Sequence, residues 1–243
     1  MASCLAERLG DLIDLSATEA LALDGLEQRE RVVRRGVVLV RENDRSSDLF
    51  VVRRGTMMSY VILPDGSRQI LRILLRGDLI GTAALAYRSA PETLFALTES
   101  TVAIVDRTAI ATLTIEHPRL AALLIAVDQM ERVALTDRLA GLGRTSAKAR
   151  VCALLIDLRN RMRALDPKIT TTFLPGLTQE EIGDATGLTA VHVNRMLRQL
   201  HDEGLLHRDG GRFTLLDEAA LMRTGCCVDR RPGLDLSWLP PAR

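Results

Sequence analysis

The chemistry most clearly indicated by residue type and spacing lies between residues 178 and 200, TQEEIGDATGLTAVHVNRMLRQL. In the second half of this stretch, small, amide and basic side chains alternate with apolar ones at the period of an α-helix, which places them on one face. Such a face suits the major groove of DNA, where an arginine can donate two hydrogen bonds to one guanine. The residues expected on it are Ala190, Val191, His192, Asn194, Arg195 and Arg198. The alternative is an ordinary helical hairpin with a solvated polar face.

Two short helices joined by a tight turn would position these side chains. Thr178 and Glu181 have the spacing of a capping box, in which the hydroxyl accepts a backbone hydrogen bond and the carboxylate accepts one from the cap residue. Gly187 suits a turn with positive φ, and Thr189 suits the cap of the second helix. The apolar residues of the second helix recur at the helical period and are Val193, Met196, Leu197 and Leu200. We therefore predict a helix–turn–helix.

A basic hairpin is predicted after these helices. Apolar residues flank the segment 207–212, and its paired glycines, Gly210 and Gly211, favour a hairpin turn. We expect this hairpin to form a wing that carries Arg212 beside the helices. Residues 144–212 contain eleven basic and eight acidic side chains, a net charge of +3 with the sign that phosphate binding requires.

Residues 31–105 have the pattern of a small β-domain. Short apolar and β-branched runs are separated by turn sequences such as Pro64-Asp65-Gly66, in which proline fixes φ and glycine accepts a positive φ. Several short strands at near-regular spacing predict a sandwich or a barrel-like roll. The predicted strands are 32–40, 49–52, 56–63, 69–75, 93–97 and 102–105. Before them, residues 9–30 predict one or two short helices, with a capping box at Ser16 and Glu19.

A long helix is predicted between these two regions, after His117-Pro118. Its apolar residues recur at the helical period over about seven turns. We predict that this stripe packs against the same helix of a second chain, the alternative being a core helix within one subunit. The stripe comprises Leu120, Leu123, Leu124, Val127, Met130, Ala134 and Leu135, and Leu139 and Leu142 extend it. Gly141 and Gly143 are expected to break the helix and form a hinge before a helix over residues 147–165.

Composition limits the class of protein. The chain has 243 residues, of which 47% are hydrophobic and 26% charged, as in soluble globular proteins, and its net charge of +1 requires any nucleic-acid surface to be local. The longest apolar run, residues 120–127, is too short to cross a bilayer, and the first residues lack the layout of a signal peptide. We therefore expect a cytoplasmic protein. The cysteines are Cys4, Cys152, Cys226 and Cys227, with no CxxC spacing, and no metal site, cofactor or catalytic arrangement is predicted.

The order of a β-roll, a long helix and a winged helix–turn–helix resembles the Crp–Fnr family of bacterial transcription factors, named after the cyclic-AMP receptor and the fumarate–nitrate regulator. The resemblance covers about residues 20–220. It rests on Gly55, Gly66, residues 77–81, Leu142-Gly143-Arg144 and the stretch 178–200. The family fold implies a homodimer whose two recognition helices lie about 34 Å apart on a pseudo-palindromic operator. It also implies that RNA polymerase is a partner.

The resemblance further implies the fold class and the domain order. The fold is expected to be α+β, with a double-stranded β-helix of the kind that binds cyclic nucleotides. The expected divisions are a sensor domain with N-terminal helices (1–116), a dimerisation helix and hinge (117–143), a winged helix–turn–helix domain (144–224) and a tail (225–243). The alternative function is a ligand-binding regulatory module that acts on a protein partner and binds little DNA.

The sensor part departs from the family pattern where an effector would bind. The cyclic-nucleotide branch places glutamate directly after the glycine that corresponds to Gly81, and this chain has Thr82. Arg88-Ser89 spells the family's phosphate clamp but lies too close to Gly81, and Glu92 occupies the downstream position, where its carboxylate would oppose a phosphate. Cyclic AMP is therefore not expected, and Arg88 is expected at the surface. If an effector binds at the corresponding place in this chain, the pocket is expected to comprise Gly81, Thr82, Arg88, Ser89, Glu92 and Thr93.

The other known effectors of the family also lack their residues here. An iron–sulfur cluster needs four clustered thiolates, and Cys4 stands alone near the N-terminus. Haem needs axial ligands, and the region of the predicted roll contains no histidine. The effector stays open, including the possibility that the protein has none.

The predicted recognition helix carries the family's reading residues only in part. Arg195 corresponds to the arginine that reads guanine. The family's glutamate four residues earlier accepts from cytosine, and Val191 stands there instead, which can contact a thymine methyl. The operator should therefore differ at that base. His192 and Asn194 are expected to reach a base or a phosphate, and Thr178 and Thr189 resemble phosphate-contacting positions at helix N-termini.

Overall fold

The computed structural model describes residues 3–242, which form two compact units. The roll unit comprises residues 3–61, 73–133 and 234–242. The helical unit comprises residues 62–72 and 134–233. Each unit has its own buried hydrophobic residues.

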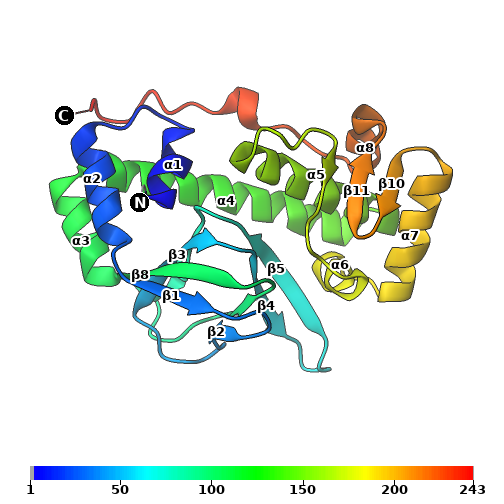
Figure 1. The fold of residues 1–243 in the computed structure, drawn as a ribbon, viewed down its shortest axis with the longest axis horizontal. Helices are drawn as coiled ribbons and strands as arrows, with labels where there is room; N and C mark the ends of the chain where they lie inside the picture. The colour runs from blue at the N-terminus through cyan, green and yellow to red at the C-terminus, as the bar shows by residue number, and fades with distance from the viewer. Residues whose placement is uncertain (1–2, 243) are drawn as a thin grey trace. The chain divides into compact units, whose positions relative to one another are not determined.

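Two four-stranded sheets form the roll, as the β-rich sequence pattern predicts (Figure 1). One sheet has the order β1 (Glu30–Val33), β8 (Ser100–Asp106), β3 (Asp48–Arg54) and β6 (Leu79–Ile80). The other has the order β2 (Val38–Val40), β7 (Thr93–Ala96), β4 (Met57–Ile62) and β5 (Arg68–Leu74). The last residue of β4 and residues 68–72 of β5 belong to the helical unit. β3 pairs antiparallel with β8 from Asp48 opposite Asp106 onward.

Strand β3 shows why the roll has two hydrophobic cores. Its residues alternate between the two faces of the sheet: Leu49 and Val51 join the core that includes the helices, while Phe50 and Val52 join the core between the two sheets. All four are buried. Full burial of one such side chain stabilises the fold by about 1.5–3 kcal/mol, so β3 contributes to the stability of both cores.

Three helices of the roll unit accompany the sheets. They are α1 (Cys4–Gly10), α2 (Ala17–Leu26) and α3 (Arg107–Glu116), and a short 3₁₀ helix, η1, spans Thr82–Leu85. The predicted capping box of α2 is confirmed, because Ser16 Oγ accepts from Glu19 N at 3.3 Å and Ser16 N donates to the Glu19 carboxylate at 2.8 Å. Sequence reasoning missed α3, whose cap is Asp106.

The long helix α4 spans Pro118–Arg144 without interruption. The predicted break at Gly141 and Gly143 is wrong, because both glycines lie within the helix and Thr145 donates through its backbone and hydroxyl to Gly141 O. The chain turns instead at residues 145–146. There Ser146 Oγ accepts from Ala149 N at 3.1 Å and begins helix α5, Ala147–Leu165.

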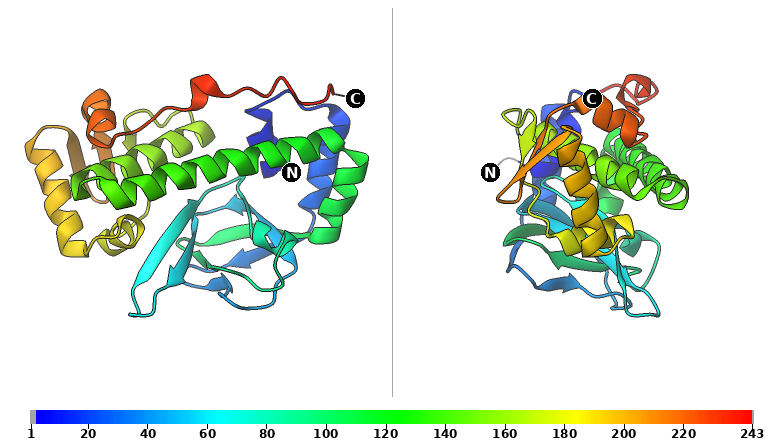
Figure 2. Two further views of the ribbon diagram at one scale, coloured as in Figure 1. Left: turned by 180° about the vertical axis from the view of Figure 1, so that it is seen from behind. Right: turned by 90° about the vertical axis from the view of Figure 1, so that its right-hand side faces the viewer.

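The helical unit has the predicted helical pair and wing. Its elements after α5 are β9 (Thr172–Phe173), α6 (Gln179–Thr186), α7 (Ala190–Asp202), β10 (Leu206–Asp209), β11 (Arg212–Leu215) and α8 (Glu218–Thr224). The three strands form a small sheet in the order β10-β11-β9, with α7 beside β10 (Figure 2). Helix α8 was not predicted, and its cap is Asp217.

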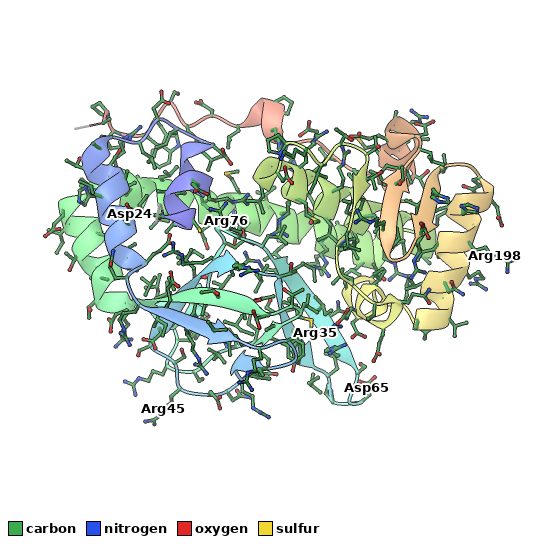
Figure 3. All side chains as sticks on the ribbon, viewed as in Figure 1. Asp24, Arg35, Arg45, Asp65, Arg76 and Arg198 are labelled. Carbon is green, nitrogen blue, oxygen red and sulfur yellow. The ribbon has the colours of Figure 1, made fainter. Side chains whose placement is uncertain are left out.

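The turn between β4 and β5 is fixed by its own residues, whereas the C-terminal tail is held by packing against distant ones. The predicted turn at Pro64-Asp65-Gly66 is confirmed: Gly66 has φ +84° and donates to Leu63 O at 2.9 Å, with Asp65 at the tip (Figure 3). The C-terminal tail packs through Leu236 and Leu239 against the helix-side core of the roll unit. Trp238 is 57% exposed and does not anchor it.

Candidate nucleic-acid interface

Helix α6 begins with two backbone N–H groups held by side chains of its own first turn. Thr178 Oγ1 accepts from Glu181 N at 3.2 Å, and Thr178 N donates to the Glu181 carboxylate at 2.7 Å. This is the capping box predicted from the sequence. The N-terminus of α6 is therefore fixed, and its remaining N–H groups and positive dipole end suit an anion.

The turn between α6 and α7 depends on two glycines. Gly187 has φ +65°, the left-handed conformation expected there. Gly183 lies inside α6, where an added Cβ would collide with the carbonyl oxygen of Leu188. Leu188 N donates to Gly183 O at 3.0 Å, so the returning chain touches the helix backbone at this point. Gly183 was missed by sequence reasoning, since a glycine within a helical pattern gives no local sign of such an approach.

Helix α7 separates a buried face from an exposed one. Thr189 Oγ1 accepts from His192 N at 3.2 Å and caps the helix as predicted. The buried residues are those predicted, namely Val193, Met196, Leu197 and Leu200. On the other side Val191 is 82% exposed, and Asn194, Arg195 and Arg198 are exposed as well, with Arg198 projecting outward (Figure 3). Ala190 and His192 are half-buried.

Two of the exposed polar groups are held by neighbours. The Arg195 Nη2 and His192 Nε2 atoms lie 2.6 Å apart. Gln179, the first residue of α6, donates through Nε2 to Asn194 Oδ1 at 3.3 Å. The face that would enter a groove therefore presents a guanidinium and an amide whose positions are restricted before any ligand is present.

The wing is a hairpin supported by aromatic packing. Gly210 and Gly211, at its tip, both have positive φ. Phe213 is buried against Phe173, with ring centroids 6.0 Å apart, and Arg208 lies over the Phe213 ring at 5.8 Å. Arg212 is exposed at the start of β11, so the wing presents a cation as predicted.

The C-terminal end of α6 is capped by three side chains from three other elements of the helical unit. Gln69 donates to Asp184 O at 2.8 Å, Arg138 to Ala185 O at 2.5 Å and Arg150 to Thr186 O at 2.8 Å. Two of the donors are guanidinium groups, which complement the negative end of the helix dipole. Burial lowers the pKa of Arg138 from its ordinary value.

The hairpin between β4 and β5 adds an ion pair to this end of α6. Arg68 Nε lies 2.7 Å from the Asp184 carboxylate, and Arg138 also donates to the carbonyl oxygens of Ile70 and Leu71. Helix α6 is thus held at its C-terminus while its N-terminus stays accessible. Sequence reasoning missed these contacts, because they join residues more than 35 positions apart.

A small cavity lies within the roll unit, where the family resemblance implies an effector. Its volume is about 20 Å³, enough for roughly one water molecule. Its lining includes Asp48, Glu92 and Ser46 together with apolar residues, and Gly81 also contributes. Among the described residues, none of those lining it is arginine, lysine or histidine.

Four residues expected in the effector pocket do not line this cavity. Thr82 begins η1, and Arg88 and Ser89 are exposed. Thr93 is buried, with its Oγ1 accepting from Glu42 N at 3.0 Å. Of the residues predicted for the effector pocket, Gly81 and Glu92 line this cavity, whereas Arg88 and Ser89 face solvent and Thr93 is buried elsewhere in the roll unit. Their contact with an effector stays a prediction.

Two models of known protein domains match separate parts of the chain. Residues 149–224 match the model of the Crp-like helix-turn-helix domain, and residues 30–117 match the cyclic nucleotide-binding domain. The fumarate and nitrate reduction regulatory protein of Vibrio cholerae is 28% identical over 210 residues, covering 86% of this chain and 83% of its own. The transcriptional activator FnrA of Stutzerimonas stutzeri is 26% identical over 209 residues, covering 86% and 85%.

A solved structure agrees in fold along almost its whole length. FixK2 from Bradyrhizobium japonicum superposes with a TM-score of 0.74 at 26% identity, covering 82% of this chain and 98% of that protein. The chain belongs to the Crp–Fnr family of transcriptional regulators. It is a DNA-binding regulator with the α+β architecture of that family, whose members are regulators of transcription rather than enzymes.

In this Crp–Fnr chain, some of the α4 residues predicted for the dimer contact are buried in the roll unit and others are exposed. Leu120 and Leu123 are 0% exposed and belong to the helix-side core of the roll unit, so their assignment to a dimer interface is wrong. Leu124 and Val127 are partly buried against the same core. Met130 and Ala134 are exposed. The predicted stripe is real but turns inward at its N-terminal end, because α1, α2 and β3 cover it there.

The cysteines of this Crp–Fnr chain are not arranged as a metal site. Cys4 is buried against the roll core, and burial raises the pKa of Cys152 to about 12 and that of Cys227 to about 11. Within residues 3–242 no group of three or more histidine, cysteine or acidic side chains is placed to hold a metal. Over the same residues, no helix has the length and apolarity needed to cross a membrane.

Proposed function

We propose that this Crp–Fnr regulator reads a pseudo-palindromic operator as a homodimer, with the exposed face of α7 in the major groove. The observation that carries the proposal is this face: Arg195 and Arg198 are exposed on it beside Val191 and Asn194, with no acidic side chain among them. A helix in the groove needs donors and small groups facing outward. Arg195 reads guanine, and Val191 contacts a thymine methyl.

The phosphate contacts surround this face. Thr178 and Thr189 lie at the two helix N-termini, where hydroxyl and dipole together favour a phosphate. Arg198 and Arg212 add cations from α7 and the wing, and Ala190 and Asn194 complete the set. Such contacts fix the register of the protein on the duplex, while base contacts supply the specificity.

The second copy is proposed to pack on the exposed apolar residues of α4. These are Ile125, Met130, Ala134, Leu135 and Leu139, of which Leu139 is 70% exposed. Apolar side chains in solvent along a helix of 27 residues suit a pair of helices packed side by side. The proposed division of the chain follows from this: sensor domain (1–116), dimerisation helix (117–143), DNA-binding domain (144–224) and tail (225–243). The setting is the cytoplasm, with RNA polymerase as partner.

Selection of binding sites from random duplex DNA tests the reading face. The full chain should enrich a two-fold symmetric sequence with a guanine in each half-site. Arg195→Ala should cost about 1–3 kcal/mol at that guanine and relax discrimination there. Arg35→Ala, an exposed arginine of the roll unit, is the matched control and should leave the selected sequence unchanged (Figure 3). An unaltered selection by Arg195→Ala would refute the assignment.

Sedimentation tests the dimer. Leu139→Asp places a charge in the proposed contact and should yield monomers at concentrations where the native chain is dimeric. Leu21→Asp is the control, because Leu21 is 69% exposed on α2 and takes no part in the proposed interface. A native chain that sediments as a monomer would contradict the proposal.

A further inference from the structure

The chemistry of His192 and Arg195 determines which of the two side chains donates the hydrogen bond between them. Arginine stays protonated in proteins and has no acceptor atom, so Arg195 Nη2 is the donor in the 2.6 Å contact with His192 Nε2. His192 Nε2 must then be the acceptor, which requires a neutral imidazole carrying its proton on Nδ1. The two residues are three positions apart on α7, where side chains share one face of the helix.

We infer that His192 is a positioning residue that holds the Arg195 guanidinium in the orientation needed to read guanine. This inference rests on the proposed function, since it assigns how Arg195 performs its part. A free arginine samples many rotamers and must lose that freedom when it binds. An acceptor beside Nη2 restricts the side chain beforehand and leaves the other N–H groups of the guanidinium for a base edge.

The surroundings of the pair support a positioning role. His192 is half-buried, whereas Arg195 is exposed, so the imidazole is the more restricted partner and the guanidinium the one that reaches out. The neighbouring amide, Asn194, is held in the same way by Gln179 from α6. No carboxylate in the described residues pairs with Arg195, so the imidazole is the acceptor that this helix supplies.

A double-mutant cycle on the full chain tests this role. The variants are His192→Ala, Arg195→Ala and both together, measured on the operator selected by the native chain and on copies with the guanine replaced. His192→Ala should lower the preference for guanine about tenfold and leave the affinity for the replaced sites nearly unchanged. In the Arg195→Ala background the same substitution should have no further effect, because nothing remains to be positioned.

Two further substitutions separate positioning from direct contact with a phosphate. His192→Gln retains an acceptor and should restore most of the guanine preference, whereas His192→Lys offers only donors and should not. The cycle of His192→Ala with Arg198→Ala is the matched control and should be additive, because Arg198 is six positions from His192 on α7, a spacing at which helix side chains do not face each other.

The results that would contradict the inference about His192 differ from the result that would contradict the proposed function. A loss of affinity that is equal on all sequences, restored by His192→Lys and accompanied by a salt slope smaller by about one, would overturn the inference and make His192 a phosphate contact. An unchanged guanine preference in His192→Ala would also overturn it. Selection of an operator by the native chain together with an inert Arg195→Ala would instead refute the proposed reading role of Arg195.

Discussion

The cavity in the roll and the exposed face of α7 carry opposite kinds of chemistry. The cavity is about 20 Å³ in volume and its charged lining residues are Asp48 and Glu92. The face of α7 is open to solvent and its charged residues are Arg195 and Arg198. Both regions belong to one family fold, yet a phosphate would be repelled at the first and attracted at the second.

This difference separates what a family fold preserves from what it allows to vary. The DNA-binding half keeps its caps, its turn and its donors, so its ligand follows from residues in place. The sensor half keeps its strands, but the residue after Gly81 is Thr82, and Arg88 is turned to the surface. Membership in the Crp–Fnr family therefore says more about the nucleic-acid surface than about the effector.

Alanine substitutions at two glycines should have the largest effects on stability. Only the one in the helical unit should also abolish operator binding. Gly183→Ala would drive a Cβ into the backbone at Leu188, where nothing flexible can move, and should cost about 3 kcal/mol or more and abolish operator binding. Gly81→Ala in the roll meets Asp48 O at 3.3 Å with φ +72° and should cost about 1–2 kcal/mol without loss of DNA binding. Thermal unfolding and gel shift measure both.

Gly143→Ala is the control for these changes. Gly143 lies within α4 with nothing within 4 Å of an added Cβ, so alanine should raise helix stability by about 1 kcal/mol. Equal destabilisation at positions 183 and 143 would mean that the close approach at Leu188 does not exist.

Val191→Glu should restore to the reading face the glutamate that the family usually has at this position. A carboxylate at this 82% exposed position can accept a hydrogen bond from cytosine N4. The variant should therefore prefer cytosine at the contacted position, and the binding free energies of the two bases should shift relative to each other by about 1–3 kcal/mol. Competitive binding to operators that differ at that base measures the change. Val191→Ala, which shortens the side chain without adding an acceptor, should weaken the thymine preference and create no new one.

Thiol reactivity should differ between residues of the helical unit. Burial raises the pKa of Cys152 to about 12 from its ordinary 9.0, so this thiol stays neutral at pH 8 and should react slowly with Ellman's reagent, while exposed Cys226 reacts at once. A raised pKa favours the neutral folded form below pH 9, and this stability is lost as the pH rises toward 12. Cys226→Ala should remove the fast phase.

The sequence predicted what is decided locally and failed where distant segments decide. Thr178 with Glu181, and Gly66 after Pro64, fix their own backbone through neighbours a few residues away, so cap and turn were predictable. Leu123 follows the same helical period as Leu139, and the period cannot tell which of them the roll covers. The support at Ala185 from Arg138, and the approach of Leu188 to Gly183, likewise follow from the fold and leave no sign in the local pattern.

Cyclic AMP should have the smallest effect, namely none, on operator affinity or unfolding temperature. A nucleotide at about a hundred times its Kd would stabilise its host by about 2.7 kcal/mol, which thermal unfolding readily detects. The cavity has room for about one water, and the Glu92 carboxylate would oppose the cyclic phosphate. A shift with the native chain would show that the roll opens and that the carboxylates do not exclude the phosphate. Glu92→Gln separates the effect of charge from that of size. A shift confined to this variant would mean that charge alone excludes the nucleotide. No shift in either protein would mean that the small volume of the cavity excludes it as well.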